Sequence, residues 1–491
     1  MEPVFEFPLD LDKRGRESLA QRLHQRLRAA IVEKRLPPGV RLPSTRRVAE
    51  AYGLARNTVI AAYDLLMAEG FIVTRPGASA QVADLGLGRR LAGRRRPPRL
   101  IAAPALEWRR AEPSETNATD AAGARLPASQ GFALGVPDHR WFPTDIWRRL
   151  LLRGASISLP DSFGYPPAEG RPSLRAAIAQ HVASTRAVVC AERDVVVTCG
   201  AQQAFDLLAR VLVKRGHTKV AIENPGYPPL RSALRAAGAQ LVPIPVDDEG
   251  LVVDSLPADV RIVCVTPSHQ FPTGVAMSLA RRRALLEFAR RNAAVIIEDD
   301  YDGEFRYGTQ PLDALQTLDR EAKVVYVGTF SKSMFPSLRL GYVVAPAWLI
   351  AALSATKQAA DNGGNTAVQE TLARFILDGH LARYARAMRK RYASRRDTLL
   401  AAIESELDDW LIAVPPSAGI HLYARYRDRR QAKRIATLAA QYAHGAQPVS
   451  DFLVQRESSI GDGIAFGFGA LDELEIKRSI RALARALKRG H

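Results

Sequence analysis

Cysteine, acidic residues and long apolar runs are all scarce in this chain of 491 residues. Its three cysteines, Cys190, Cys199 and Cys264, stand singly with no Cys-x-x-Cys pair, so neither a disulfide framework nor a zinc or other metal site is expected. No apolar run approaches the ~18 residues of a membrane-spanning helix, and the first residues lack the basic start and apolar core of a signal peptide. These absences predict a cytoplasmic protein with no membrane partner.

The shortage of acidic residues leaves a net charge of +18, from 69 Lys and Arg against 51 Asp and Glu. A surplus of this size suggests a polyanionic partner. The surplus is concentrated near the N-terminus, because residues 11–83 hold 13 Lys and Arg but only 6 Asp and Glu. With 47% hydrophobic residues the composition is ordinary for a folded protein. A chain this long is expected to form two or more domains.

Composition divides the chain into three regions. Residues 11–83 are typical of short helices followed by a small hairpin. Residues 84–128 are rich in Arg, Pro and Ala without a sustained period, which predicts a flexible linker. Over 129–491, apolar β-branched runs alternate with amphipathic stretches, which predicts an α/β fold with a mostly parallel sheet covered on both faces. The expected strands are 195–198, 220–222, 262–265, 295–297 and 324–327; the expected helices include 201–214, 278–292 and 366–404; a smaller α+β subdomain is expected at about 358–491.

Residues 44–59 have the pattern of a helix-turn-helix. Ser44 is suited to cap a helix that Gly53 ends, and a second helix opens directly afterwards. In this motif the second helix enters the DNA major groove with its first residues on base edges. Arg56 is suited to guanine and Asn57 to adenine, whereas Thr58 or Ser44 is suited to phosphate.

A basic three-helix module that binds no DNA is the plainer interpretation, and the wider span argues against it. The span resembles the GntR-type winged helix in its Leu-x-Pro-Gly turn and in its Leu-Pro-Ser-x-Arg, Arg-x-Thr-Val, Ala-Tyr-x-x-Leu and Glu-Gly motifs. It departs from that family at the wing, where Ala78-Ser79-Ala80 follows Gly77. The resemblance implies operator double-stranded DNA as a partner. The residues expected to contact it are Arg41, Ser44, Arg46, Arg47, Arg56, Asn57, Thr58, Arg75 and Gly77.

A single lysine, Lys332, stands just after the apolar run 324–327. The hydroxyls of Thr329 and Ser331 flank it, and Arg339 follows seven residues later. A pyridoxal phosphate (PLP) site built on a Schiff base needs a rigidly held amine, donors for the phosphate and a dry surround. A solvated turn could hold the same residues, so this segment alone does not decide.

The run 295–301 brings a carboxylate to the end of another buried strand. Either Asp299 or Asp300 could supply this carboxylate. Asp299 is favoured, because it lies two residues from Tyr301 and so faces the same side of an extended segment. Asp300 is then expected to be a helix cap or a surface acid.

Together these segments resemble the fold-type I PLP aminotransferases. The resemblance implies that Lys332 forms the Schiff base, Asp299 pairs with the pyridine nitrogen and Tyr301 contacts the ring hydroxyl. It assigns the ring-stacking aromatic to Tyr227, and to Tyr165 a contact with the phosphate of the other subunit, hence a homodimer. It implies a phosphate site made by Ala201, Gln202, Thr329, Ser331 and Arg339.

Two positions differ from the aminotransferase pattern. The family Asn near the ring hydroxyl is absent from 268–274, which leaves His269 or Gln270 as the candidate. Aligning 463–468 with the strand that usually carries a carboxylate-binding arginine puts Ala465 at that position. No arginine lies between Arg456 and Arg478, so recognition of an α-carboxylate is not expected.

A GntR-like winged helix joined by a linker to an aminotransferase-like domain is similar to the MocR subfamily of bacterial regulators. The resemblance implies a PLP-dependent transcription regulator that senses PLP, a small amine or an amino acid at Lys332. The alternative is a working aminotransferase that carries a DNA-binding appendage. The missing arginine favours sensing over turnover, because turnover needs a substrate held in a reactive geometry.

Overall fold

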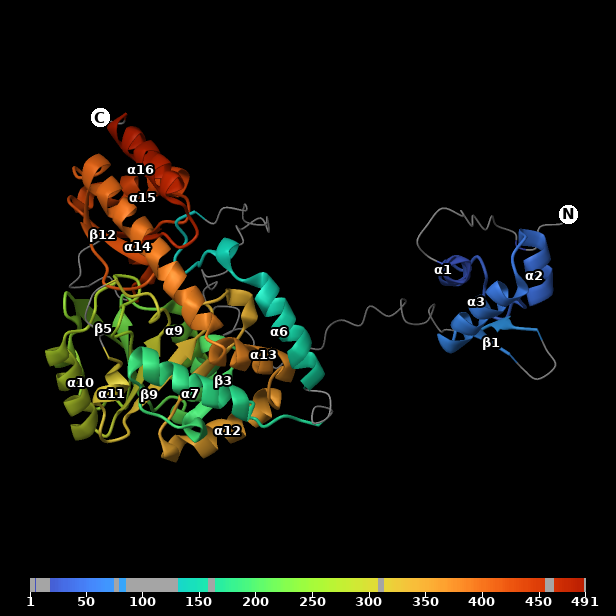
Figure 1. Cartoon of the computed structure of the whole chain (residues 1–491), viewed down its shortest axis with the longest axis horizontal. Coiled ribbons are helices and arrows are strands. Elements are labelled where there is room, and N and C mark those ends of the chain that lie inside the picture. The colour runs from blue at the N-terminus through green and yellow to red at the C-terminus, as the bar shows by residue number, and fades with distance from the viewer. Residues whose placement is uncertain are drawn as a thin grey trace. The chain divides into compact units, whose positions relative to one another are not determined.

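A computed structural model describes residues 5, 18–74, 79–84, 131–157, 164–307, 313–454 and 463–489. The chain divides into two compact units, Met1–Ala102 and Ala103–His491 (Figure 1). The segment 85–128 of the expected linker, and the expected DNA contacts Arg75 and Gly77, lie outside the described residues. No helix in the described ranges is long and apolar enough to cross a bilayer.

The smaller unit consists of three helices and a two-stranded antiparallel sheet. They are α1 (Leu19–Val32), α2 (Thr45–Tyr52), α3 (Arg56–Ala68), β1 (Ile72–Val73) and β2 (Gln81–Val82). Ser44 caps α2 by accepting a hydrogen bond from the Arg47 backbone N–H at 3.3 Å, and Gly53 ends it in the left-handed region, as the sequence predicted. The apolar faces of the helices meet in a core that includes Leu23, Leu27, Val48, Val59 and Leu66.

The larger unit contains an eight-stranded sheet in the order β3-β10-β9-β8-β7-β4-β5-β6. Neighbouring strands from β9 to β5 are parallel, while β10 and β6 run antiparallel to their neighbours. This confirms the prediction of a mostly parallel sheet. The strands are β3 (Val195–Thr198), β4 (Lys219–Asn224), β5 (Gln240–Asp247), β6 (Gly250–Leu251), β7 (Ile262–Val265), β8 (Val295–Asp300), β9 (Val324–Thr329) and β10 (Gly341–Val344).

Helices cover both faces of this sheet, which explains why its strands are continuous apolar runs. Ile297 and Val325 face the cluster formed with α8, α9 and α12, whereas Ile296 and Val324 face the cluster formed with α10. The helices that pack on the sheet are α7 (Pro172–Arg186), α8 (Gly200–Leu212), α9 (Pro228–Ala236), α10 (Leu279–Arg291), α11 (Leu315–Leu318) and α12 (Ala347–Asp361).

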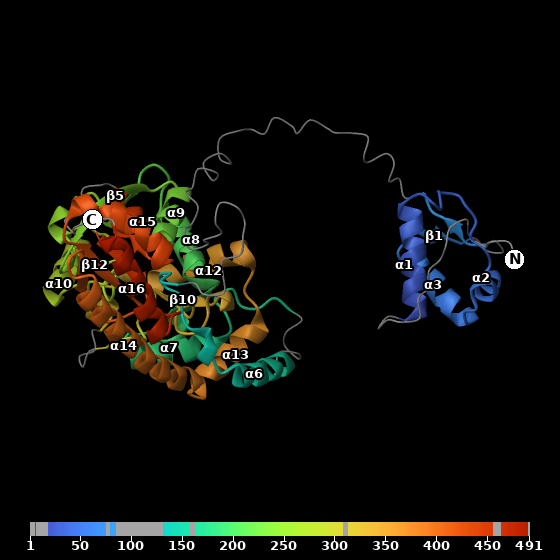
Figure 2. The ribbon, with the colours of Figure 1, turned by 90° about the horizontal axis from the view of Figure 1, so that it is seen from above.

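A second, smaller sheet occupies the C-terminal part, with four antiparallel strands in the order β11-β12-β14-β13. Helices α14 and α16 lie side by side next to it (Figure 2). The strands are β11 (Leu411–Val414), β12 (His421–Tyr426), β13 (Gln447–Pro448) and β14 (Gly463–Gly467). The remaining helices are α6 (Thr144–Ile157), α13 (Thr366–Leu377), α14 (His380–Glu406), α15 (Ala432–Tyr442) and α16 (Glu473–Lys488).

The single helix predicted over 366–404 is wrong, because the chain forms two helices there. Helix α13 ends at Leu377 and α14 begins at His380. Between them Gly379 has a φ of 73°, in the left-handed region that a right-handed helix cannot contain. The glycine therefore starts a new helix instead of being carried through one.

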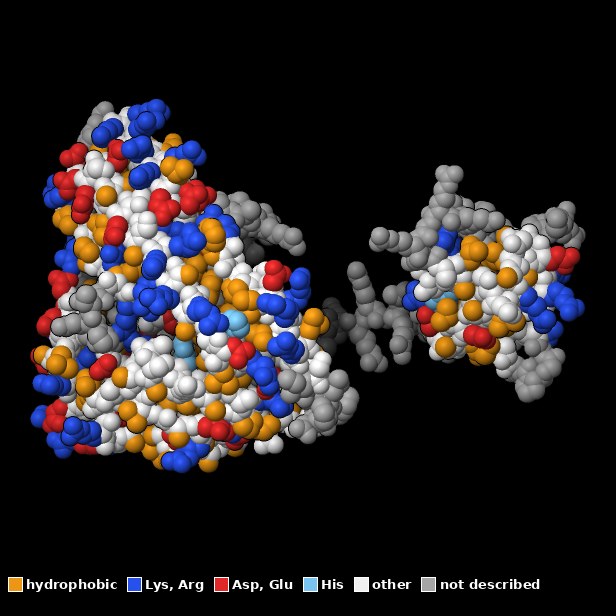
Figure 3. Space-filling view, in the orientation of Figure 1, with side chains coloured by type: hydrophobic (Ala, Val, Ile, Leu, Met, Phe, Trp, Pro, Cys, Tyr) orange, Lys and Arg blue, Asp and Glu red, His pale blue; other side chains and the backbone are white. Residues whose placement is uncertain are grey.

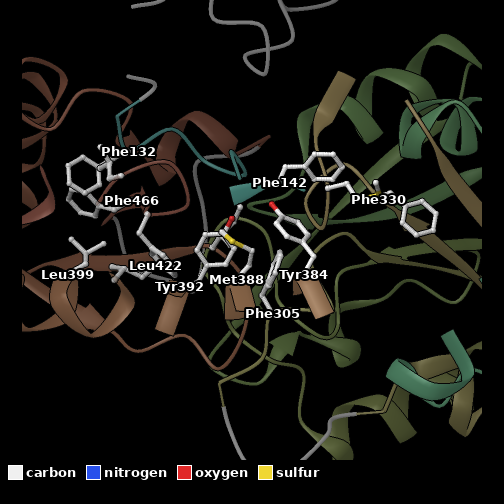
Figure 4. Packing of buried hydrophobic residues seen from close by; sticks show 14 of the residues in the cluster. Phe132, Phe142, Phe305, Phe330, Tyr384, Met388, Tyr392, Leu399, Leu422 and Phe466 are labelled. Carbon is white, nitrogen blue, oxygen red and sulfur yellow. The ribbon is translucent and has the colours of Figure 1, made fainter. Parts of the chain in front are cut away.

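One buried cluster joins the small sheet to the large one, with α14 between them (Figure 4). Phe132 packs edge-on against Phe466 of β14 with ring centroids 5.5 Å apart. Tyr392 of α14 packs edge-on against Phe305, with centroids 4.9 Å apart. Because α14 contributes to this shared core, it sets how β12 and β14 face the ends of the large sheet.

Candidate functional site

Lys332 lies three residues after β9 and is only partly accessible to solvent. Burial lowers the pKa of its amine, although the carboxylates of Asp302 and Asp299 act in the opposite direction. Gly135 leaves room for the amine, because a Cβ atom at that position would lie 2.7 Å from Lys332 Nζ. Burial therefore shifts the amine of Lys332 toward its free-base form, which is the form that can bond to an aldehyde carbon.

Asp299 and Asp300 end the neighbouring strand β8, and their environments differ. Asp300 accepts hydrogen bonds from Arg186 and from the Tyr326 hydroxyl, so it is a buried ion-pair partner rather than the cap or surface acid expected from the sequence. Asp299 is 4% exposed, and its Oδ1 atom has no hydrogen-bond partner among the described residues. Burial, followed by the charges of Asp300 and Asp302, raises the pKa of Asp299 well above its usual range. A buried oxygen without a donor fits a protonated ring nitrogen.

Behind Asp299, Tyr301 and His269 form a small hydrogen-bonded group with Asp302. The Tyr301 hydroxyl donates to the His269 carbonyl at 3.0 Å. The His269 Nδ1 atom lies 2.9 Å from Asp302 Oδ2, so Asp302 acts as its acceptor, while the His269 Nε2 atom has no partner among the described residues. Sequence reasoning missed Asp302, although its position in Asp-Asp-Tyr-Asp was a visible signal.

The two candidates left open in the loop 268–274 have different surroundings. The Gln270 amide donates to the Pro225 carbonyl at 2.9 Å and its oxygen accepts from the Thr273 hydroxyl at 2.6 Å. The polar atoms of Gln270 are therefore already engaged with protein groups. The Nε2 atom of His269 has no partner among the described residues, so His269 remains the better candidate of the two.

The N-terminus of α8 meets Arg339 and the β9 hydroxyls. Gly200 has a φ of 73°, and a Cβ atom at this position would lie 3.1 Å from the Arg339 guanidinium. That guanidinium donates a hydrogen bond to the Cys199 carbonyl at 2.9 Å. Ser331 N–H donates to Thr329 Oγ1 at 3.2 Å. The first helical N–H groups, including those of Ala201 and Gln202, have no partner within the helix. A helix N-terminus, hydroxyls and a guanidinium fit a phosphate dianion.

Tyr227 interacts electrostatically with both the buried carboxylate and the cation of the candidate phosphate site. Its pKa is raised by burial and by Asp299, and Arg339 partly opposes this, so the ring lies within electrostatic range of both. Phe271 supports the ring edge-on, with centroids 5.3 Å apart. A tyrosine ring has the chemistry to stack on a planar pyridine. Tyr165, by contrast, is 86% exposed on this single chain and is not brought to the group.

Exposed basic side chains surround the start of α3, the second helix of the helix-turn-helix. Arg56 and Asn57 begin α3 and are exposed, whereas Val59 and Tyr63, further along the helix, are buried in the core. Lys and Arg side chains gather at the α2 edge of this unit (Figure 3). The exposed candidates are Arg41, Ser44, Arg46, Arg47, Arg56 and Asn57, and Thr58 is half-buried.

Ala465 stands where aminotransferases usually carry a carboxylate-binding arginine, and it lies inside the small sheet. Ala465 of β14 is fully buried and pairs with Tyr423 of β12 and with Gln447 of β13. The methyl group of Ala465 offers no charge to a substrate.

Comparisons with known proteins agree with the two-part architecture. Residues 19–82 match the bacterial regulatory proteins of the gntR family, and residues 142–460 match aminotransferase class I and II. The probable rhizopine catabolism regulatory protein MocR of Rhizobium meliloti is 35% identical over 487 residues, covering 97% of this chain and 95% of that protein. The pyridoxine biosynthesis transcriptional regulator PdxR of Corynebacterium glutamicum is 28% identical, covering 99% of both chains.

Solved structures resemble the larger unit. The kynurenine aminotransferase of Pyrococcus horikoshii, in complex with PMP, superposes with a TM-score of 0.68 at 28% identity, covering 74% of this chain and 92% of that one. A fold-type I aminotransferase domain implies binding of PLP, and a GntR winged helix implies binding of DNA. The chain therefore belongs to the MocR subfamily of GntR-type transcription regulators, in which a winged helix is joined to an aminotransferase class I and II domain.

Proposed function

We propose that this protein is a PLP-dependent regulator that binds operator DNA through its winged helix and senses PLP or a small amine at Lys332. The observation that carries the proposal is the buried Oδ1 atom of Asp299, which no residue in the described ranges hydrogen-bonds and which interacts electrostatically with a lysine of lowered pKa. Asp299 acts electrostatically on Lys332, Asp299 and Arg339 both act on Tyr227, and Arg339 adjoins Gly200 at the start of α8.

Different residues would bind different parts of the cofactor and the ligand. PLP, when bound, supplies an aldehyde carbon for which the Lys332 amine and an incoming effector amine compete. Asp299 would hold a proton on the ring nitrogen, and Tyr227 would cover one ring face. Ala201, Gln202, Thr329, Ser331 and Arg339 would bind the phosphate. Tyr301 and His269 would contact the ring hydroxyl, and Tyr165 would act across a homodimer.

Sensing is favoured over catalytic turnover by Ala465. Without a cation on β14, an α-carboxylate lacks the bidentate partner that would orient it for reaction. A working aminotransferase is the competing function. Wild-type turnover of common α-amino acids at ordinary aminotransferase rates would favour that competitor.

The proposal is tested by measuring operator affinity in three states: the apo protein, the PLP-loaded protein and the amine-saturated protein. A ligand shifts a regulator only by its differential affinity for the two conformations. We expect the states to differ by a coupling of about 1–3 kcal/mol, seen in fluorescence anisotropy of labelled promoter DNA. Identical affinity, stoichiometry and DNA bending in all three states would contradict sensing.

A second test concerns the role of Arg56 at the exposed start of α3. Arg56→Ala is expected to cost about 1–3 kcal/mol at the operator and to relax base preference there. Arg46→Ala and Arg47→Ala serve as matched controls, because contacts with phosphate weaken all DNA alike and change the salt dependence. Equal losses on operator and random DNA for Arg56→Ala would rule out base reading.

A further inference from the structure

Two buried histidines face each other on the side of the site where the carboxylate-binding arginine is missing. His421 of β12 lies opposite Gly467, and Tyr423 lies opposite Ala465. Residues paired across antiparallel strands share a face, and so do residues two apart along a strand. His421 and Ala465 are therefore on the same face of the small sheet. The ring of His421 lies 4.4 Å from that of His269, and the charge of Lys332 acts on it.

The pair carries polar atoms that no described residue satisfies. Both side chains are almost fully buried, yet His269 Nε2 and both ring nitrogens of His421 lack a hydrogen bond of normal geometry within the described ranges. Buried polar atoms are rarely left without a partner, because desolvation without a new hydrogen bond is unfavourable. A ligand with matching polar groups is the natural partner here.

The protonation of the pair determines which ligand group fits it. The Asp302 carboxylate accepts from His269 Nδ1, which leaves Nε2 as an acceptor in the neutral ring. Burial is the main cause that lowers the pKa of His421 well below its usual value, and the backbone contact with Pro272 opposes this without reversing it. A neutral His421 offers one donor and one acceptor. A hydroxyl group complements this set, whereas a carboxylate has acceptors only.

We propose that the effector is a hydroxylated amine without an α-carboxylate, and that His269 and His421 bind its hydroxyl groups. This inference rests on the proposed function, because the amine of the effector would compete with Lys332. The groups of His269, Asp302 and His421 also lie within 4.8 Å of one another, as metal ligands do. The Asp302 carboxylate already accepts a hydrogen bond from His269 Nδ1, however, so these two atoms are engaged with each other and not with a metal.

The test compares three amines that share one branched carbon skeleton. Serinol carries two hydroxymethyl groups, serine replaces one of them with a carboxylate, and isopropylamine replaces both with methyls. PLP-loaded full-length protein is titrated with each, followed by visible absorbance and by operator affinity. We expect serinol to half-saturate at a concentration about tenfold below either relative, a factor equal to 1.4 kcal/mol. Addition of a chelator is expected to change nothing.

Variants of His421 test whether the preference for serinol depends on the histidine pair. His421→Phe is expected to remove the advantage of serinol over isopropylamine, whereas His421→Asn, which keeps a donor and an acceptor, retains it. His217→Phe, at an exposed position of the same unit, is the matched control. If His421→Phe does not fold, the preference for serinol measured on the wild type and on His421→Asn still tests the inference.

Three outcomes overturn the inference: equal affinity for all three amines, tighter binding of serine, or loss of the preference on chelation. Tighter binding of serine would point to Arg306, whose guanidinium has buried nitrogens without a partner among the described residues. Failure of the proposed function looks different. In that case borohydride would fix no PLP on the protein and no amine would change the absorbance, whereas failure of this inference alone leaves both signals intact.

Discussion

Replacing Lys332 with alanine is expected to abolish covalent retention of PLP completely. Burial lowers the pKa of the Lys332 amine, and the amine interacts electrostatically with Asp299, whose Oδ1 atom has no hydrogen-bond partner in the described part of the chain. Together these features favour a carbon–nitrogen bond at Lys332. We expect borohydride treatment, followed by mass spectrometry of peptides, to find pyridoxyl on the Lys332 peptide of the wild type and none on the variant. Operator binding by the separate winged helix is expected to persist.

The matched control is Lys323→Ala, at the opposite end of the same strand β9. This variant keeps Lys332 and is expected to retain the cofactor fully. If the Lys332→Ala protein still carried borohydride-fixed cofactor on another lysine, the assignment of Lys332 would be wrong.

Replacing Arg186 with methionine is expected to lower the free energy of unfolding of the larger unit by about 3–5 kcal/mol, because it leaves a buried charge without its partner. Arg186 and Asp300 have side chains only 3% and 2% exposed, and Arg186 also donates to Ser268. Burial opposes the charge of Arg186, but Asp300 and other nearby groups outweigh it and raise its pKa.

All five tryptophans of the chain lie after residue 102, so tryptophan fluorescence during urea unfolding reports on the larger unit. Arg193→Met is the control, because Arg193 is exposed and lies 3.9 Å from Asp194; such pairs contribute about 0–1 kcal/mol. The double variant Arg186→Met with Asp300→Asn is expected to recover part of the loss, since it removes the unpaired charge. A loss for Arg186→Met as small as that of the control would show that the pair is not a buried ion pair.

The winged helix could be predicted from local patterns almost in full. Ser44 and Gly53 are capping residues whose chemistry acts within one turn of the chain, and each begins or ends α2 as expected. Five strands of the large sheet, β3, β4, β7, β8 and β9, were equally visible, because helices cover both faces of the sheet and their central positions are then apolar, whereas β5, β6 and β10 were not predicted. Gly379 was misjudged, since a glycine in an amphipathic pattern does not reveal whether its φ is positive.

The sequence by itself determined the two-part architecture, the lysine segment and the absence of an arginine at Ala465, because each depends on residues close together in the chain. Only the tertiary structure decided which acid is free. Asp300 accepts from Arg186, which lies 114 residues away in the chain, whereas Asp299 Oδ1 has no hydrogen-bond partner among the residues that the structure describes. The meeting of His269 and His421 was likewise decided by the packing of the small sheet against the large one. Local patterns report the conformation of a segment, whereas partners across the fold depend on how the layers pack.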